Sequence, residues 1–128
     1  MNKDRELSNI EANERRLKQS IKVADLVEVT AFYKDKMTVD VKPLVKREIS
    51  GAYVSPPPIL SVKVAYVPMV AEEVEIKPDI KPGDIGAVVY LDLDSDGAIS
   101  SGAESKPVSV RLHSGDDAIF VGVLMIGL

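Results

Sequence analysis

The chain contains no cysteine and no tryptophan, and among its 128 residues there is a single histidine, His113. Without cysteine we expect no disulfide framework and no thiolate chemistry. One histidine does not make a multi-imidazole site for a transition metal, except by symmetry in an oligomer. No apolar run approaches the length of a membrane span, and the charged residues 2–6 do not read as a signal peptide.

Positive charge is also in short supply. The 16 Lys and Arg residues are outnumbered by 20 Asp and Glu residues, which gives a formal net charge of −4. Proteins that bind a phosphate backbone normally display clustered Lys and Arg. We therefore expect no nucleic-acid partner.

Residues 1–21 form the first segment of the chain, and residues 3–21 are predicted to be a charged helix. Its apolar residues recur at heptad spacing, and Glu14 stands where a fifth apolar residue would fall. These residues are Leu7, Ile10, Leu17 and Ile21. The stripe is narrow and covers little core surface. The helix is therefore interpreted in two ways, as packed on its own domain or as self-associating or docked to a partner.

Residues 22–128 are predicted to form a small barrel, because most of their apolar side chains are Val, Ile and Leu, which favour strands. Strands are predicted at residues 23–33, 37–49, 59–67, 85–93, 108–112 and 119–128. A turn with an extended, proline-rich continuation is predicted at 50–58, a loop or short strand at 69–80, and a polar loop at 94–107. Pro43 is placed at an edge or bulge, and Gly86 indicates the close approach of another backbone or a barrel corner. The predicted fold class is all-β, a small five-stranded OB-fold-like barrel preceded by one N-terminal α-helix.

Three aspartates are spaced as at the start of a calcium-binding loop, and Gly97 follows them. They are Asp92, Asp94 and Asp96. The twelfth position, which supplies a bidentate Glu in such loops, is Ala103, and the flanks read as strands rather than helices. We expect an acidic loop on the barrel rim, no metal and no cofactor, with a calcium loop as the less favoured alternative.

No catalytic arrangement is visible in the sequence. His113 is expected to make an ordinary imidazole–carboxylate hydrogen bond with Asp116 or Asp117, which are close to it in the chain. A triad of Ser114, His113 and Asp117 would lack a nucleophile turn and an oxyanion motif. There is no phosphate-binding Gly-Lys motif. We therefore expect that the protein is not an enzyme.

Five features follow one another in a fixed order. The first is a helix followed by the strand of residues 21–33, and the second is Thr-Val-Asp-Val-Lys-Pro at 38–43. The third is the pair of prolines and the apolar strand of 57–66. The fourth is Lys-Pro-Gly-Asp-Ile-Gly at 81–86, and the fifth is Arg-Leu-His with Asp-Ala-Ile-Phe-Val-Gly within 111–122. In this order they resemble the N-terminal OB-fold domain of bacteriophage central-spike proteins, the membrane-puncturing devices of contractile tails. The resemblance covers about residues 5–122. The residues that carry its last two motifs are Pro82, Gly83, Asp84, Gly86, Arg111, His113 and Asp117.

The resemblance implies a homotrimer on the tail axis, located in the virion baseplate after synthesis in the bacterial cytoplasm. Its partners would be a baseplate hub protein above and a spike-tip or needle protein below. Such proteins usually continue into a β-helix with a His-x-His iron-binding tip, which this sequence lacks. Either this sequence is a part of a longer spike protein, or the natural protein is only a platform that serves injection of the viral genome while another chain supplies the needle. In both cases we expect no direct membrane insertion by this chain. The alternative is an OB-fold binding module for single-stranded nucleic acid or carbohydrate.

A trimer would let the apolar C-terminal strand bury against its symmetry mates. A soluble monomer that ended on this strand would expose a sticky surface. The predicted subunit or partner interface consists of Leu7, Ile10, Leu17, Ile21, Val121, Val123, Leu124 and Ile126.

Overall fold

The computed structural model describes residues 3–125. A long helix comes first, and nine strands, a short helix and one 3-10 turn follow it. The elements are α1 (Lys3–Ser20), β1 (Ala24–Tyr33), β2 (Thr38–Pro43), β3 (Arg47–Ile49), β4 (Ala52–Val54), β5 (Ile59–Val64), β6 (Met69–Ala71), β7 (Val74–Ile76), β8 (Ile85–Tyr90), α2 (Asp96–Ser101), η1 (Gly115–Asp117) and β9 (Ala118–Val123). Neither described helix combines the length and the apolar character needed to cross a membrane.

Five of the strands close into a barrel in the order β1-β2-β5-β9-β8. All neighbours run antiparallel except β5 and β9, which are parallel. The ten-residue β1 pairs with β8 over Ala24–Glu28 and with β2 over Val27–Tyr33, and the β1–β2 ladder contains a bulge between Val29 and Ala31. The predicted fold class, a five-stranded OB-fold-like barrel after one N-terminal helix, is therefore confirmed.

The barrel interior is filled by aliphatic side chains around one aromatic ring. Phe120 is fully buried on β9, and valines from four other barrel strands surround it. Those that are at most 2% exposed are Val27, Val29, Val39, Val41, Val62 and Val88. Gly86 on β8 leaves room for the Phe120 ring, because a Cβ atom there would lie 2.5 Å from its Cζ. The same Cβ atom would overlap the carbonyl oxygen of Gly122, so the close approach of another backbone predicted at Gly86 is present.

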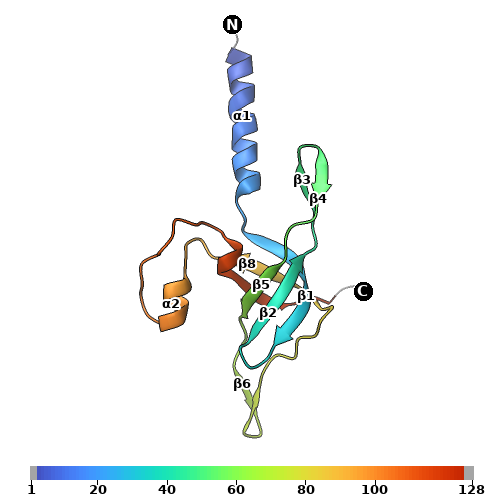
Figure 1. Ribbon diagram of the computed structural model, residues 1–128, viewed down its shortest axis with the longest axis vertical. Helices are drawn as coiled ribbons and strands as arrows, with labels where there is room; N and C mark the ends of the chain where they lie inside the picture. The colour runs from blue at the N-terminus through green and yellow to red at the C-terminus, as the bar shows by residue number, and fades with distance from the viewer. Residues whose placement is uncertain (1–2, 126–128) are drawn as a thin grey trace.

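Two short hairpins project from the barrel at opposite ends, as Figure 1 shows for β3–β4 and β6. Every residue of β3, β4, β6 and β7 is exposed. The prediction that the second strand continues to Ile49 is wrong, because the strand ends at Pro43, which cannot donate to a ladder, and Arg47–Ile49 pairs with Ala52–Val54 instead. The connection at residues 69–80 contains the β6–β7 hairpin.

The loop between β8 and β9, residues 91–117, differs from the prediction in two places. Residues 96–101 form α2, where a polar loop was expected. Residues 108–112 form no strand, and the only pairing there is a single bridge between Leu93 and Leu112. The side chains of Ser109 and Arg111 face carboxylates of the same loop, so this segment is held by side chains rather than by a ladder.

Helix α1 projects away from the barrel (Figure 1). Its apolar residues are between 47% and 66% exposed, including Ile21 just after its end. The stripe of Leu7 and Ile10 is therefore not covered by the barrel, which excludes the first of the two interpretations of this helix for the single chain.

Candidate functional site

The most strongly connected polar group in the described residues is a cluster around Arg111. Its Nε atom donates to Oδ2 of Asp117 at 2.8 Å, and its Nη2 atom lies 2.8 Å from Oδ1 of Asp94 and 2.9 Å from Oδ2 of Asp96. The Asp117 and Asp94 side chains are at most 1% exposed. The backbone N–H of Ser95 and the hydroxyl of Ser109 donate to the remaining oxygens of these two carboxylates. The buried charges are thus paired and hydrogen-bonded, as burial requires.

Asp94, Asp117 and Arg111 are held in their charged forms. The hydrogen bond from Arg111 is the largest effect on Asp117, and it lowers the pKa of that carboxyl despite burial. Burial alone would raise the pKa of Asp94, but the hydrogen bonds from Ser109 and from the backbone of Asp96, together with the Arg111 charge, lower it on balance. The pKa of Arg111 is raised, chiefly by its hydrogen bond to Asp117. Because Asp117 adjoins β9, the cluster anchors the β8–β9 loop to the barrel.

The acidic loop is arranged differently from a calcium loop. Asp94 and Asp96 come together with Asp117, and the three carboxylates lie within 4.8 Å of one another. Asp92, the first residue of the predicted string, is 86% exposed at its side chain and stands apart from them. α2 begins at Asp96, and Arg111 supplies the positive charge among the three carboxylates. The spacing of the aspartates at 92, 94 and 96 did not indicate that Asp117 joins this group of carboxylates. Asp117 is far from Asp96 in the sequence, because the rest of α2 and the segment up to η1 lie between them.

His113 does not contact the carboxylates expected for it. Its Nδ1 atom is 3.7 Å from Oδ1 of Asp92, too far for a hydrogen bond, and is buried without a hydrogen-bond partner in the described residues. Asp117 forms an ion pair with Arg111 instead. The expected hydrogen bond from His113 to Asp116 or Asp117 is therefore wrong.

The turn at residues 81–86 holds β8 against β1. The carboxylate of Asp84 accepts a hydrogen bond of 2.9 Å from the backbone N–H of Lys81, three residues earlier, which ties the two ends of the turn together. Two further backbone bonds of 2.8 Å join Val29 to this turn, one from the N–H of Gly83 and one to the carbonyl of Asp84. Gly83 has a φ of +97°, which favours glycine. The motif residues of this turn thus act in closing the barrel.

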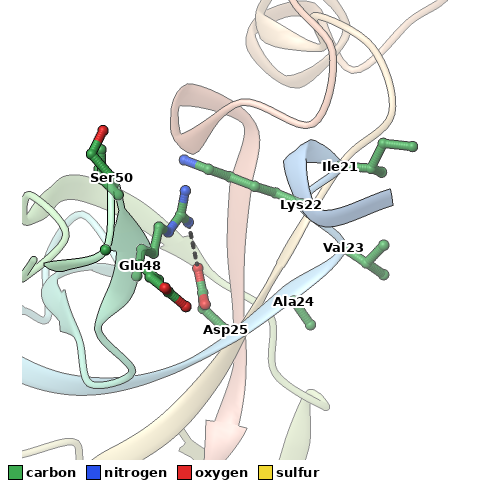
Figure 2. Close-up of a pocket in the computed structure, with 10 residues that line it drawn as sticks. Ile21, Lys22, Val23, Ala24, Asp25, Glu48 and Ser50 are labelled. Atoms are coloured by element: carbon green, nitrogen blue, oxygen red, sulfur yellow. Dashed lines mark ion pairs between the residues drawn. The ribbon is translucent and has the colours of Figure 1, made fainter. Parts of the chain in front are cut away.

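An open groove of about 770 Å³ lies between residues 21–25 and the β3–β4 hairpin (Figure 2). Figure 2 shows Lys22 reaching across it, whereas Ile21 and Val23 point away. Asp25 accepts a hydrogen bond of 2.6 Å from the Tyr90 hydroxyl and lies 3.7 Å from Nη2 of Arg47. Burial, and then the bond to Asp25, raise the pKa of Tyr90 far above its usual range. The ion pair connects the hairpin to the barrel.

The end of β9 presents an apolar strip to solvent. Its exposed fractions lie between 47% and 79%. The strip consists of Val121, Val123, Leu124 and Met125, and is called the C-terminal strip below. A hydrogen bond of 2.7 Å from the Leu124 N–H to the Ile85 carbonyl keeps it attached to β8. The predicted interface residue Ile126 lies outside the described residues.

A second exposed apolar surface was missed by the sequence analysis. Val108 and Val110 in the β8–β9 loop are 85% and 97% exposed, because the residue next to each of them turns its side chain toward the Arg111 cluster. Figure 1 places this loop on one side of the barrel and the C-terminal end on the other. The alternation of apolar and polar residues over 108–112 is the signal in the sequence that this segment has one apolar and one polar side.

Aromatic side chains do not gather on one face of the barrel. Tyr90 is buried against Asp25, and the Tyr33 hydroxyl donates to Asp40 at 3.0 Å. Tyr53 is on the projecting strand β4, and Tyr66 follows β5. A platform on which successive bases stack needs neighbouring aromatics interleaved with cations. The described residues do not provide one.

Neither protein-family models nor curated proteins match this sequence.

Proposed function

We propose that this chain is a structural, non-catalytic protein that assembles into a homotrimer. It would form the OB-fold platform of a central spike, on the axis of a phage tail baseplate or a related contractile injection machine. The C-terminal strip carries this proposal. It continues directly from β9, the strand of the fully buried Phe120, yet it leaves four apolar side chains in water.

The polar interior supports a structural role. The buried carboxylates of Asp94 and Asp117 are held by Arg111 and by local donors, so neither is left to act as an acid, a base or a nucleophile. Thr38 is the other buried polar residue among those described. Large apolar side chains are exposed on the hairpins, in the β8–β9 loop and at the end of β9, and exposed apolar surface of this kind is used in assembly.

The position of the two exposed apolar surfaces fits a ring. A surface that meets a different surface on the next copy makes a head-to-tail interface, and such interfaces close into rings when the rotation closes. The β8–β9 loop and the end of β9 lie on opposite sides of the barrel (Figure 1). Contact between the strip of one copy and the loop of the next would cover both.

The proposal that the chain belongs to a phage tail rests on its resemblance to central-spike proteins, described above. Its motif residues Arg111 and Asp117 form an ion pair, and residues 81–86 close the barrel, so both motifs serve the fold itself. A baseplate hub protein and a spike-tip or needle protein are the partners that this setting supplies, and the virion is its location. Mass spectrometry of purified particles should find the chain in intact tails, and its absence from tails would exclude this setting.

The oligomeric state is the direct test. Light scattering coupled to size exclusion should give three times the chain mass of 13.9 kDa at tens of micromolar. Leu124→Asp puts a charge in the C-terminal strip and should yield monomers, because an unpaired buried charge is costly. Val70→Asp on the exposed β6–β7 hairpin is the matched control and should remain trimeric. A monomeric wild-type chain would refute the trimer.

Binding of single-stranded oligonucleotides distinguishes the alternative function. We expect no change in fluorescence anisotropy of a labelled oligonucleotide at low salt, where electrostatic binding is strongest. Saturable binding by the trimer would favour the binding module over the platform.

A further inference from the structure

Helix α1 is the part of the molecule with the least support from the fold. It has 18 residues and makes no extensive contact with any strand or helix among the described residues. In proteins most of the stability of a helix comes from packing of its apolar face against other elements. Its apolar residues Leu7 and Ile10 are more than half exposed. The helix therefore presents an apolar stripe that suits another helix.

The charges beside the stripe decide which helix fits. In heptad terms Leu7, Glu14 and Ile21 occupy position a, and Ile10 occupies position d. Glu6 and Glu11 then fall at the flanking positions g and e. From residue 6 to residue 14 the positions that face a partner hold three carboxylates and no cation.

A second copy of α1 is a poor occupant. Helices related by a threefold axis run parallel and in register, so three Glu14 carboxylates would converge on the axis. In the same arrangement Glu6 of one copy lies beside Glu11 of the next, because positions g and e of neighbouring helices pair in parallel coiled coils. Both contacts place like charges side by side, and this repulsion disfavours the pairing of α1 with a second copy of itself.

We infer that α1 docks onto an amphipathic helix of a different protein, one that carries Lys or Arg at the level of Glu14 and along the edge that faces Glu6 and Glu11. The apolar side chains of that helix cover Leu7 and Ile10, and its cations neutralise the three carboxylates. Charge complementarity of this kind sets partner choice and orientation in paired helices. The inference rests on the proposed function only in that the chain joins a larger assembly.

The two surfaces then have separate roles. The C-terminal strip joins copies of the chain, and α1 docks to the foreign helix. α1 leaves the barrel at another side than the end of β9 (Figure 1). This separation makes the inference distinguishable from the proposed trimer, because a variant of one surface should not affect the other.

The oligomeric state of two α1 variants is the first test. Ile10→Ser should leave the mass of the wild-type protein unchanged, since α1 does not join the copies. Glu14→Leu makes the stripe continuously apolar and should create self-association that increases with concentration. If Ile10→Ser dissociates the trimer, α1 binds a second copy and the inference is overturned. If Leu124→Asp alone dissociates it, the proposed trimer and this inference both stand.

A matched pair of synthetic helices is the second test. Each peptide has about three heptads with Ile at a and Leu at d, and one carries Lys at the layer of Glu14 and at its e and g positions, where the other carries Glu. Fluorescence anisotropy with the full-length chain should show the Lys peptide binding about tenfold more tightly than the Glu peptide. The preference should reverse with the chain variant that combines Glu11→Lys and Glu14→Lys.

Salt and helicity give independent readouts of the same complex. The preference for the Lys peptide should shrink in high salt, because exposed charges are screened. Circular dichroism should show a gain of helix on mixing. Equal affinity for both peptides, or no binding of either, would overturn the inference whatever the oligomeric state of the chain.

Discussion

Gly86→Ala tests whether the barrel is closed as described. Gly86 lies on β8 between Val27 of β1 and Val123 of β9, so its backbone pairs on both sides. A Cβ atom there would lie 2.5 Å from Cζ of Phe120 and would overlap the carbonyl oxygen of Gly122. Phe120 is fully buried and has no space into which it can move.

The magnitude follows from two opposing effects. Overpacking a well-packed core costs about 1–3 kcal/mol, and the upper end applies here because one of the two obstacles is backbone. Gly86 has an ordinary φ, so alanine also restricts the unfolded chain and returns about 0.4–1 kcal/mol. We expect a net loss of about 2 kcal/mol in the free energy of unfolding, or roughly 8 °C in Tm for a domain of this size.

Thermal unfolding by circular dichroism at one fixed protein concentration measures this loss, since assembly makes Tm depend on concentration. Gly115→Ala is the matched control, because its Cβ would meet Ile59 at 3.7 Å, an ordinary contact. It should change the free energy of unfolding by less than about 0.5 kcal/mol. If the two variants unfold at the same temperature, the packing of Gly86 against Phe120 is wrong.

Two predictions concern the Arg111 cluster. The pKa values of Asp94 and Asp117 are lowered in the folded protein, so their contribution to stability is present above the unfolded aspartate value of about 3.9 and is lost as the pH falls through the lower folded values. Thermal unfolding from pH 7 to pH 3 should therefore show Asp117→Asn to be less stable at neutral pH and less sensitive to acid than the wild type, and parallel curves would contradict the lowered pKa. Calcium should not raise the Tm of the wild type, because Arg111 already lies within 3 Å of Asp94, Asp96 and Asp117. It should raise the Tm of Arg111→Met, which leaves the three carboxylates without their cation, and a calcium effect on the wild type would show that Arg111 is readily displaced.

The barrel could be predicted from the sequence because its signals are local. Alternation along β1 and β2, the Pro-Gly turn before β8 and a glycine within β8 each constrain a strand and its neighbours. The need for glycine at position 86 follows from the same reasoning, since a glycine inside an apolar strand leaves space for another group to pack against the backbone. Here that is Phe120, which is 34 positions later in the sequence.

Alternation alone did not show which side of a segment faces the barrel. Residues 108–112 alternate like a strand, but their polar side chains turn inward to Asp94 and Asp117, which are distant in the sequence. In residues 59–67, simple alternation places Leu60, Val62, Val64 and Tyr66 on one face of the strand. Leu60 is exposed instead, because a bulge around Ser61, which has a φ of +56°, brings Ile59 toward the core.

The bulge itself depends on a contact that the sequence does not announce. The carboxylate of Asp40 accepts a hydrogen bond of 2.9 Å from the backbone N–H of Ser61 and another from the Tyr33 hydroxyl. Asp40 is the polar residue of the motif at residues 38–43, and its partners come from two different strands. Such tertiary hydrogen bonds outweigh the period of the side chains, so the register of β5 had to come from the structure.

Closure of the barrel also limits how the protein can assemble. A closed sheet leaves none of its five strands with a free side along its whole length, so copies cannot join by pairing whole barrel strands edge to edge. Copies can then meet through the parts that extend beyond the closed ladder: α1, the two hairpins, the β8–β9 loop and the end of β9. Most of the exposed large apolar side chains of the described residues lie in these parts, although Leu60 on β5 and Val67 after it are exposed as well. The division between a buried, valine-rich barrel and exposed apolar extensions is what a module built to hold several neighbours at once requires.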